Sequence, residues 1–150
     1  MIECNYDKSE VVVILDEEIH SSRHDIEAVL RRLMDQISGM PCSDGHVREI
    51  ELALAEALAN AIVHGNREDP DKYVHVWAGC VKSEQLILAI TDQGEGFDLD
   101  SVPDPTTAEN IYSTHGRGIF LMNCLMDSAE HRLGGRQVIM RKRMKRASIE

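Results

Sequence analysis

A helix with two polar residues four positions apart, followed by two pairs of glycines, constrains this chain more than any other feature. The helix is predicted from about residue 44 to residue 64, because apolar residues recur at helical spacing and Gly65 follows. Glu56 and Asn60 lie away from that apolar stripe. Since an α-helix turns by about 100° per residue, positions four apart lie on one face, about a turn apart. We therefore expect a carboxylate and an amide to face the same cavity.

The rest of the hydrophobic pattern predicts one domain of 150 residues with a core from about residue 10 to residue 143. Strands are expected at 11–15, 73–81, 85–91, 130–133 and 137–143, and further helices at 25–37 and 116–126. The second and third strands form most simply a hairpin, as do the last two. Residues 98–115 are rich in Asp, Pro, Ser and Thr with little periodicity, which predicts a loop.

Composition limits the classes of function. The chain carries 16 basic and 26 acidic residues, a formal net charge of −10, which opposes non-specific attraction to the phosphates of nucleic acids. With 43% hydrophobic residues, a chain of this length can bury an apolar core without disulfides. We expect free, mostly buried thiols, because no C-x-x-C pair occurs among Cys4, Cys42, Cys80 and Cys124.

Both ends of the sequence have plain interpretations. The first ten residues contain acids and lack the apolar stretch of a signal peptide, and no run approaches the roughly 20 apolar residues of a membrane-spanning helix. We therefore expect a cytoplasmic protein. The basic residues from Arg141 to Arg146 are expected to form the solvated end of the last strand, since the remainder of the chain is acidic.

Three motifs occur in a fixed order: EALANAIVHG at 56–65, DQGEGF at 92–97 and GRG at 116–118. Their order and spacing resemble the Bergerat-type (GHKL) ATP-binding superfamily. Within it, the short domain resembles the serine kinases that double as anti-sigma factors in bacterial partner switching. The resemblance covers about residues 10–143. It implies an α+β fold, a two-layer sandwich of the histidine-kinase-like ATPase type, whose mixed, mostly antiparallel sheet is covered on one face by helices.

The resemblance assigns a Mg²⁺-binding role to Asn60 and an adenine-binding role to Asp92. The residue types suit these roles, because Mg²⁺ prefers oxygen ligands and an ionised carboxylate is a strong acceptor for an amino group. Glu56 lies one turn before Asn60, beside the expected Mg²⁺ and phosphates. There its carboxylate could orient an incoming hydroxyl and take its proton, so we expect it to be the catalytic residue.

The glycines are expected to shape the nucleotide site. Gly94 and Gly96 would let the backbone pass close to the base and sugar, where a β-carbon would obstruct it. Gly116 and Gly118 would do the same near the phosphates, at a helix start that offers free backbone N–H groups to an anion.

Three further side chains are candidates for contact with nucleotide. His64 follows Asn60 by another turn, although it equally suits a polar residue that ends a helix beside Gly65. The guanidinium of Arg117 matches phosphate geometry, although an exposed loop arginine is the commoner outcome, and Thr114 is a weaker candidate. The resemblance equates the segment 101–115 with the ATP lid, which we expect to order only when nucleotide or partner binds.

The leading hypothesis is a Mg-ATP-dependent protein serine/threonine kinase that phosphorylates an anti-sigma-factor antagonist and otherwise binds a sigma factor. The family resemblance supplies these partners and implies a homodimer. A second hypothesis is a regulatory module that binds ATP without transferring phosphate, which the presence of Glu56 disfavours. A third is the catalytic fragment of a sensor histidine kinase. It is disfavoured because His20 and His24 are not followed by a second long helix before the nucleotide-binding helix.

Overall fold

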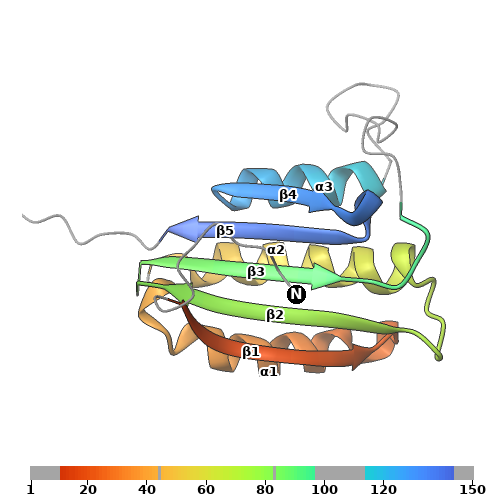
Figure 1. The fold of residues 1–150 in the computed structure, drawn as a ribbon, viewed down its shortest axis with the longest axis horizontal. Coiled ribbons are helices and arrows are strands. Elements are labelled where there is room, and N and C mark those ends of the chain that lie inside the picture. Colours follow the sequence, from red (N-terminus) through yellow and green to blue (C-terminus); the bar gives the residue numbers. More distant parts are fainter. Residues whose placement is uncertain (1–10, 44, 83, 97–113, 144–150) are drawn as a thin grey trace, which may run out of the picture.

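A computed structural model describes residues 11–43, 45–82, 84–96 and 114–143, with the backbone alone for 41 and 114–117. In these residues, five strands form one sheet and three α-helices cover one of its faces (Figure 1). The strands are β1 (Val11–His20), β2 (Tyr73–Val81), β3 (Gln85–Thr91), β4 (Ser128–Arg132) and β5 (Gln137–Arg143). The helices are α1 (Ile26–Ser38), α2 (Val47–Ala59) and α3 (Thr114–Leu125). The expected two-layer α+β fold is confirmed.

Short helical segments join these elements. A π-helix, Asn60–Gly65, continues α2 without a break in the chain. Turns of 3₁₀-helix lie at Arg23–Asp25, Pro41–Ser43 and Leu133–Gly135. Helix α2 itself begins at Val47, with His46 as its N-cap, which is three residues later than the sequence predicted.

The strand order is β1-β2-β3-β5-β4, and every pairing in the described sheet is antiparallel, where a mixed sheet was expected. Strands β3 and β5 are neighbours although α3 and β4 lie between them in the sequence. Their register pairs Thr91 with Gln137. The end of β3 and the start of β5 therefore lie side by side.

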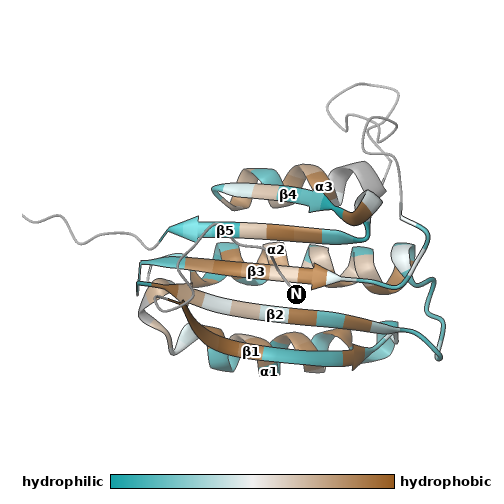
Figure 2. Ribbon diagram, viewed as in Figure 1, coloured by the Kyte–Doolittle hydropathy of each residue, from teal (hydrophilic) through white to brown (hydrophobic). Residues whose placement is uncertain are grey.

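Strand β1 is longer than predicted. Its expected range stopped at residue 15, because Asp16, Glu17 and Glu18 have low strand propensity. Figure 2 shows the apolar first half of β1 and its mostly hydrophilic second half. The strand nevertheless pairs with β2 as far as His20, and the side chain of Ile19 is buried in the core. Pairing and burial thus override propensity, whereas the predicted ranges of β2, β3 and β5 are confirmed.

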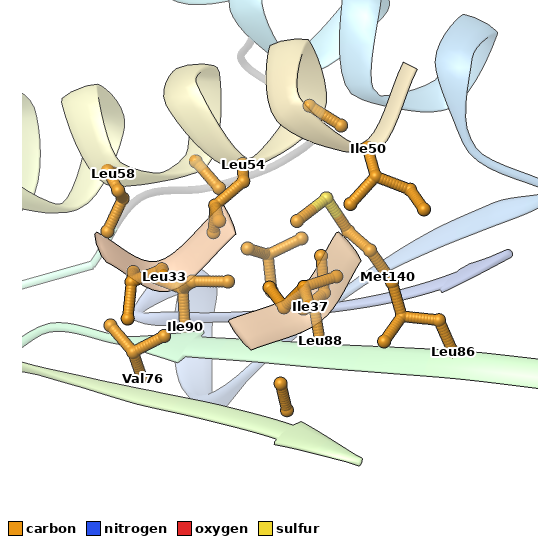
Figure 3. Packing of buried hydrophobic residues seen from close by; sticks show 14 of the residues in the cluster. Leu33, Ile37, Ile50, Leu54, Leu58, Val76, Leu86, Leu88, Ile90 and Met140 are labelled. Atoms are coloured by element: carbon orange, nitrogen blue, oxygen red, sulfur yellow. The ribbon is translucent and has the colours of Figure 1, made fainter. Parts of the chain in front are cut away.

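The core lies between the helices and the sheet. Fully buried side chains of α1 and α2 face those of the central strands (Figure 3): Leu33, Ile37, Ile50, Leu54 and Leu58 from the helices, and Val76, Leu86, Leu88, Ile90 and Met140 from the sheet. Burying each side chain of this kind contributes about 1.5–3 kcal/mol. This packing fixes α2 on the sheet and leaves its polar face toward α3, against which α2 also packs.

The described cysteines agree with the expected free thiols. Cys42 and Cys80 are buried and Cys124 is exposed, and all three are unbridged. Cys4 lies outside the described residues.

Candidate functional site

A pocket of about 510 Å³, part of it open to solvent, lies where the end of β3 faces the π-helix. The polar and glycine residues that line it include Asn60, His64 and Gly65 from the π-helix, Asp92 and Gly96 after the end of β3, and Arg136 just before β5. The apolar side chains of Ile90, Met122 and Val138 line it as well. A concave site with an apolar wall and a few converging polar groups is the usual form of a small-molecule site.

The π-helix shapes one wall of this pocket. Its wide turn is visible in the backbone bond from the N–H of Asn66 to the carbonyl oxygen of Ala61, five residues earlier, at 2.8 Å. Ala59 and Asn60 keep ordinary helical angles, so the winding changes without a kink. Such π-turns occur frequently at functional sites. The predicted helix from 44 to 64 is thus correct in its end but wrong in its winding over the last turn.

Asp92 directly follows β3 and is held on both sides. Its N–H donates to the carbonyl oxygen of Arg136 at 2.8 Å, and its Oδ1 accepts from the N–H of Gly94 at 2.8 Å. Gly65 leaves the space that the carboxylate fills, because a β-carbon there would lie only 2.5 Å from the Asp92 Cγ. The π-helix and the residue that follows β3 can therefore approach this closely only with glycine at position 65.

Burial and charge act in opposite directions on this carboxylate. Burial raises the pKa of the Asp92 carboxyl above its ordinary value of 3.8. The N–H of Gly94 and the charges of Arg136 and Lys72 oppose this rise. The group is therefore a half-buried acceptor, the kind of group that recognises an amino group of a ligand.

The glycines after Asp92 let backbone segments touch. A β-carbon on Gly94 would lie only 2.7 Å from the carbonyl carbon of Gly65, so the loop rests directly on the π-helix. Gly96 has a φ of +79°, and a β-carbon there would also collide with the carbonyl of Gly134 in the turn between β4 and β5. Both positions therefore require glycine, and Gly96 borders the pocket.

The other end of the site forms where α3 crosses α2. A β-carbon on Gly118 would lie 2.9 Å from Glu56 Oε2 and 3.4 Å from Asn60 Oδ1. The structure thus brings Glu56, Asn60 and Gly118 together, as their order in the sequence suggested. Both polar side chains are half-buried, and Asn60 lines the pocket while Glu56 lies beside it.

The remaining candidates differ in how much the structure says of them. His64 is exposed and lines the pocket from the π-helix. Thr114, Gly116 and Arg117 belong to the first turn of α3, where the backbone alone is described. Most of the segment compared with a lid, residues 101–113, lies outside the described residues, so its expected ordering stays a prediction.

Two polar side chains of the pocket escaped the sequence analysis. Arg136 and His131 come from the final hairpin and line the same pocket as Asp92. The hairpin itself was predicted, but no pattern in the sequence shows that β5 pairs with β3. That pairing alone brings Arg136 next to Asp92.

The pocket has donors for a nucleotide but few ligands for a bare metal ion. Among the described residues, no group of three or more His, Cys, Asp or Glu side chains is placed to hold a metal. Mg²⁺ commonly takes one or two protein ligands and completes its shell with water and phosphate oxygens. The amide oxygen of Asn60 fits that limited role, and the pocket beside Asp92, with its apolar wall, fits a ring that carries an amino group.

No helix in the part of the chain that the structure describes has the length and apolar character needed to cross a membrane.

Comparison with known proteins decides the family. The model of the histidine kinase-like ATPase domain matches residues 19–142. This chain belongs to that family. The expected resemblance to the Bergerat-type superfamily is thereby confirmed. The resemblance to the group of serine kinases and anti-sigma factors within it is confirmed as well, since similar proteins are named serine-protein kinase and anti-sigma F factor.

Two relatives and one structure illustrate the similarity. The serine-protein kinase RsbW of Bacillus subtilis (strain 168) is 30% identical over 87 residues, which cover 54% of each chain. The anti-sigma F factor of Clostridium perfringens (strain SM101 / Type A) is 32% identical over 101 residues, 64% of this chain and 71% of the relative. The histidine kinase domain of the Erythrobacter litoralis EL346 blue-light activated histidine kinase is 18% identical with a TM-score of 0.47, over 79% of this chain and 60% of that one. The matched region thus spans only about half of the first relative.

Proposed function

We propose that this protein binds ATP with Mg²⁺ in the pocket described above and transfers a phosphoryl group to a serine or threonine hydroxyl of a partner protein. One observation carries the proposal: the half-buried acceptor Asp92 and the amide of Asn60 line the same pocket, and the carboxylate of Glu56 lies beside it. Asp92 occupies the gap left by Gly65, and Glu56 with Asn60 surrounds Gly118. Membership of an ATPase family supports the same ligand.

Asp92 is the residue proposed to select the base. Its Oδ1 is oriented by the N–H of Gly94, which leaves the second carboxylate oxygen able to accept from an amino group. The apolar side chains of Ile90, Met122 and Val138 offer the surface on which a flat ring would lie.

Glu56 and Asn60 are proposed to act at the phosphate end. When bound, Mg²⁺ and ATP supply the transferable phosphoryl group and the positive charge that neutralises phosphate oxygens. Asn60 would hold the metal through its amide oxygen. Glu56 lies one turn away, and its Oε2 would be 2.9 Å from a β-carbon on Gly118. Its carboxylate would orient the incoming hydroxyl and accept its proton.

The biological role is proposed from the relatives. The related proteins are named a serine-protein kinase and an anti-sigma F factor. We accordingly propose that this protein binds a sigma factor, phosphorylates an anti-sigma-factor antagonist and acts as a homodimer in the cytoplasm.

Calorimetric titration tests the nucleotide site. ATP would be titrated into the wild type with Mg²⁺ and with Mg²⁺ chelated, and then into Asn60→Ala. Asn123→Ala is the matched control, because Asn123 is exposed and its amide donates to the carbonyl of Ile119 within α3 itself. Mg²⁺-dependent binding that Asn60→Ala loses and Asn123→Ala keeps is expected. No binding by the wild type would contradict the proposal.

A second experiment separates the kinase from a regulatory module. Glu56→Gln keeps the shape of the side chain but removes its basicity, and a general base typically contributes a factor of about 10²–10⁴ to the rate. Phosphoryl transfer to a purified antagonist protein should fall by about that factor while the Kd for ATP stays within about twofold. Glu51→Gln, on the exposed side of the same helix, is the control. Equal transfer by the wild type and Glu56→Gln would favour a module in which Glu56 is structural.

A further inference from the structure

Asn66, the first residue after the π-helix, is a buried polar side chain outside the pocket. Only 1% of its surface is exposed. Its Nδ2 donates to Ser21 Oγ at 2.7 Å and to the carbonyl oxygen of Tyr73 at 2.9 Å, and its Oδ1 accepts from the N–H of Gln93 at 2.7 Å. A primary amide has two N–H groups and one carbonyl, so this side chain uses all of them.

These bonds join the end of the π-helix to three strand ends. Ser21 follows β1, Tyr73 begins β2, and Gln93 follows Asp92 after β3. Two further bonds complete the network: Ser21 Oγ donates to the carbonyl of Lys72 at 2.9 Å, and Gln93 Oε1 accepts from the N–H of Tyr73 at 2.7 Å. A buried donor or acceptor that loses its partner destabilises the fold, so these side chains and peptides are held in one arrangement.

The network determines how Asp92 is presented. The peptide before Asp92 is held from β5, where the carbonyl of Arg136 accepts from the Asp92 N–H at 2.8 Å. The peptide after Asp92 is held by Asn66, through the N–H of Gln93. The orientation of the two peptides sets the direction of the Asp92 side chain and brings the N–H of Gly94 to its Oδ1.

We propose that Asn66 is a positioning residue for base recognition: by fixing the peptide between Asp92 and Gln93, it sets the preference of the site for an adenine nucleotide. This inference rests on the proposed function, because it assumes that Asp92 contacts the base. Asn66 acts through Asp92, since it does not itself line the pocket.

A selectivity ratio distinguishes this role from a merely structural one. Inosine triphosphate carries a carbonyl where ATP carries an amino group, so an acceptor carboxylate favours ATP over it. The measurement is the ratio of the Kd for inosine triphosphate to the Kd for ATP, together with Tm, for the wild type and for variants. A general loss of stability weakens the binding of both nucleotides alike, whereas a misdirected Asp92 reduces their ratio.

Variants of the network separate the two effects. Asn66→Ala removes the bond to Gln93 and is expected to reduce the ratio by about tenfold, the scale of one hydrogen bond to a charged group. Ser21→Ala is the matched control, since it removes two bonds of the same network but leaves the N–H of Gln93 bound to Asn66. It should lower Tm and leave the ratio unchanged. Asn66→Asp keeps an acceptor for Gln93 and is expected to retain more of the ratio than Asn66→Ala.

The outcomes are distinct. If the wild type binds neither nucleotide, the proposed function fails and this inference fails with it. If the wild type prefers ATP and folded Asn66→Ala keeps the same ratio, this inference alone is overturned. Should Asn66→Ala not fold, Asn66→Asp decides. It keeps an acceptor for the N–H of Gln93 and loses the two bonds that the amide donates, so its ratio should stay near that of the wild type, and a complete loss of the preference for ATP would overturn the proposal.

Discussion

Replacing Gly65 by alanine tests how closely the π-helix and Asp92 must approach. The added methyl group would lie 2.5 Å from Asp92 Cγ, so the carboxylate or the helix has to move. Overpacking of this kind costs about 1–3 kcal/mol, and the lower entropy of an unfolded chain with alanine offsets about 0.4–1 kcal/mol of it. We expect a net loss of up to about 2.6 kcal/mol, which for a domain of this size lowers Tm by up to roughly 10 °C.

The same change should weaken nucleotide binding. Displacing Asp92 removes a hydrogen bond to a charged group, which contributes about 1.5–3 kcal/mol and corresponds to a roughly 10- to 150-fold rise in the Kd for ATP. Calorimetric titration and a thermal melt measure both effects on one preparation.

Gly39→Ala is the matched control for this experiment. A β-carbon at 39 meets nothing closer than 3.7 Å, and its φ of −77° suits alanine. That variant should gain about 0.4–1 kcal/mol and bind ATP as the wild type does. If Gly65→Ala were equally stabilised and kept its affinity for ATP, the argument from close approach would be refuted.

Two more predictions concern the two ends of the site. Asp92→Asn should raise Tm at pH 7, because burial raises the pKa of the Asp92 carboxyl and its ionised form therefore destabilises the fold. That gain should shrink as the pH falls through the raised pKa, where the wild-type carboxyl takes up a proton; a gain independent of pH would contradict the assigned cause. Gly118→Ala places a methyl group 2.9 Å from Glu56 Oε2, which can move at a cost of about 0.5–1.5 kcal/mol, similar to the roughly 1 kcal/mol that alanine gains over glycine in a helix. Its Tm should thus change little while phosphoryl transfer falls at least about tenfold, and an unchanged rate would show that Glu56 needs no fixed position.

The sequence predicted those parts of the fold that depend on local patterns. Strands β2, β3 and β5 are runs of apolar and β-branched residues bounded by turns, and they were predicted to the residue. The spacing of Glu56 and Asn60 likewise placed them on one face of the predicted helix, which in the structure is α2 and the π-helix that continues it, and both side chains lie beside Gly118. Each of these features follows from the period of a helix or a strand.

Features that depend on tertiary contact could not be predicted in this way. The residues from Asn60 to Gly65 would suit an ordinary α-helix, so nothing local shows the π-turn that they form. The second half of β1 is acidic and becomes a strand only because β2 pairs with it. No local pattern distinguishes Asn66, and only the meeting of three strand ends shows how its amide is used.

The strand order has a consequence for how the chain is made. Synthesis proceeds from the N-terminus, and β5 is the last described element to emerge. Until it does, β3 has one unpaired edge along a run of five buried residues, Leu86–Ile90, which is the kind of edge that invites wrong pairing. The part of the pocket wall that Arg136 and Val138 form is missing as well, because these residues are made together with β5, which Gln137 bonds to Thr91. A chain truncated before residue 136 would therefore combine an aggregation-prone sheet edge with an incomplete pocket.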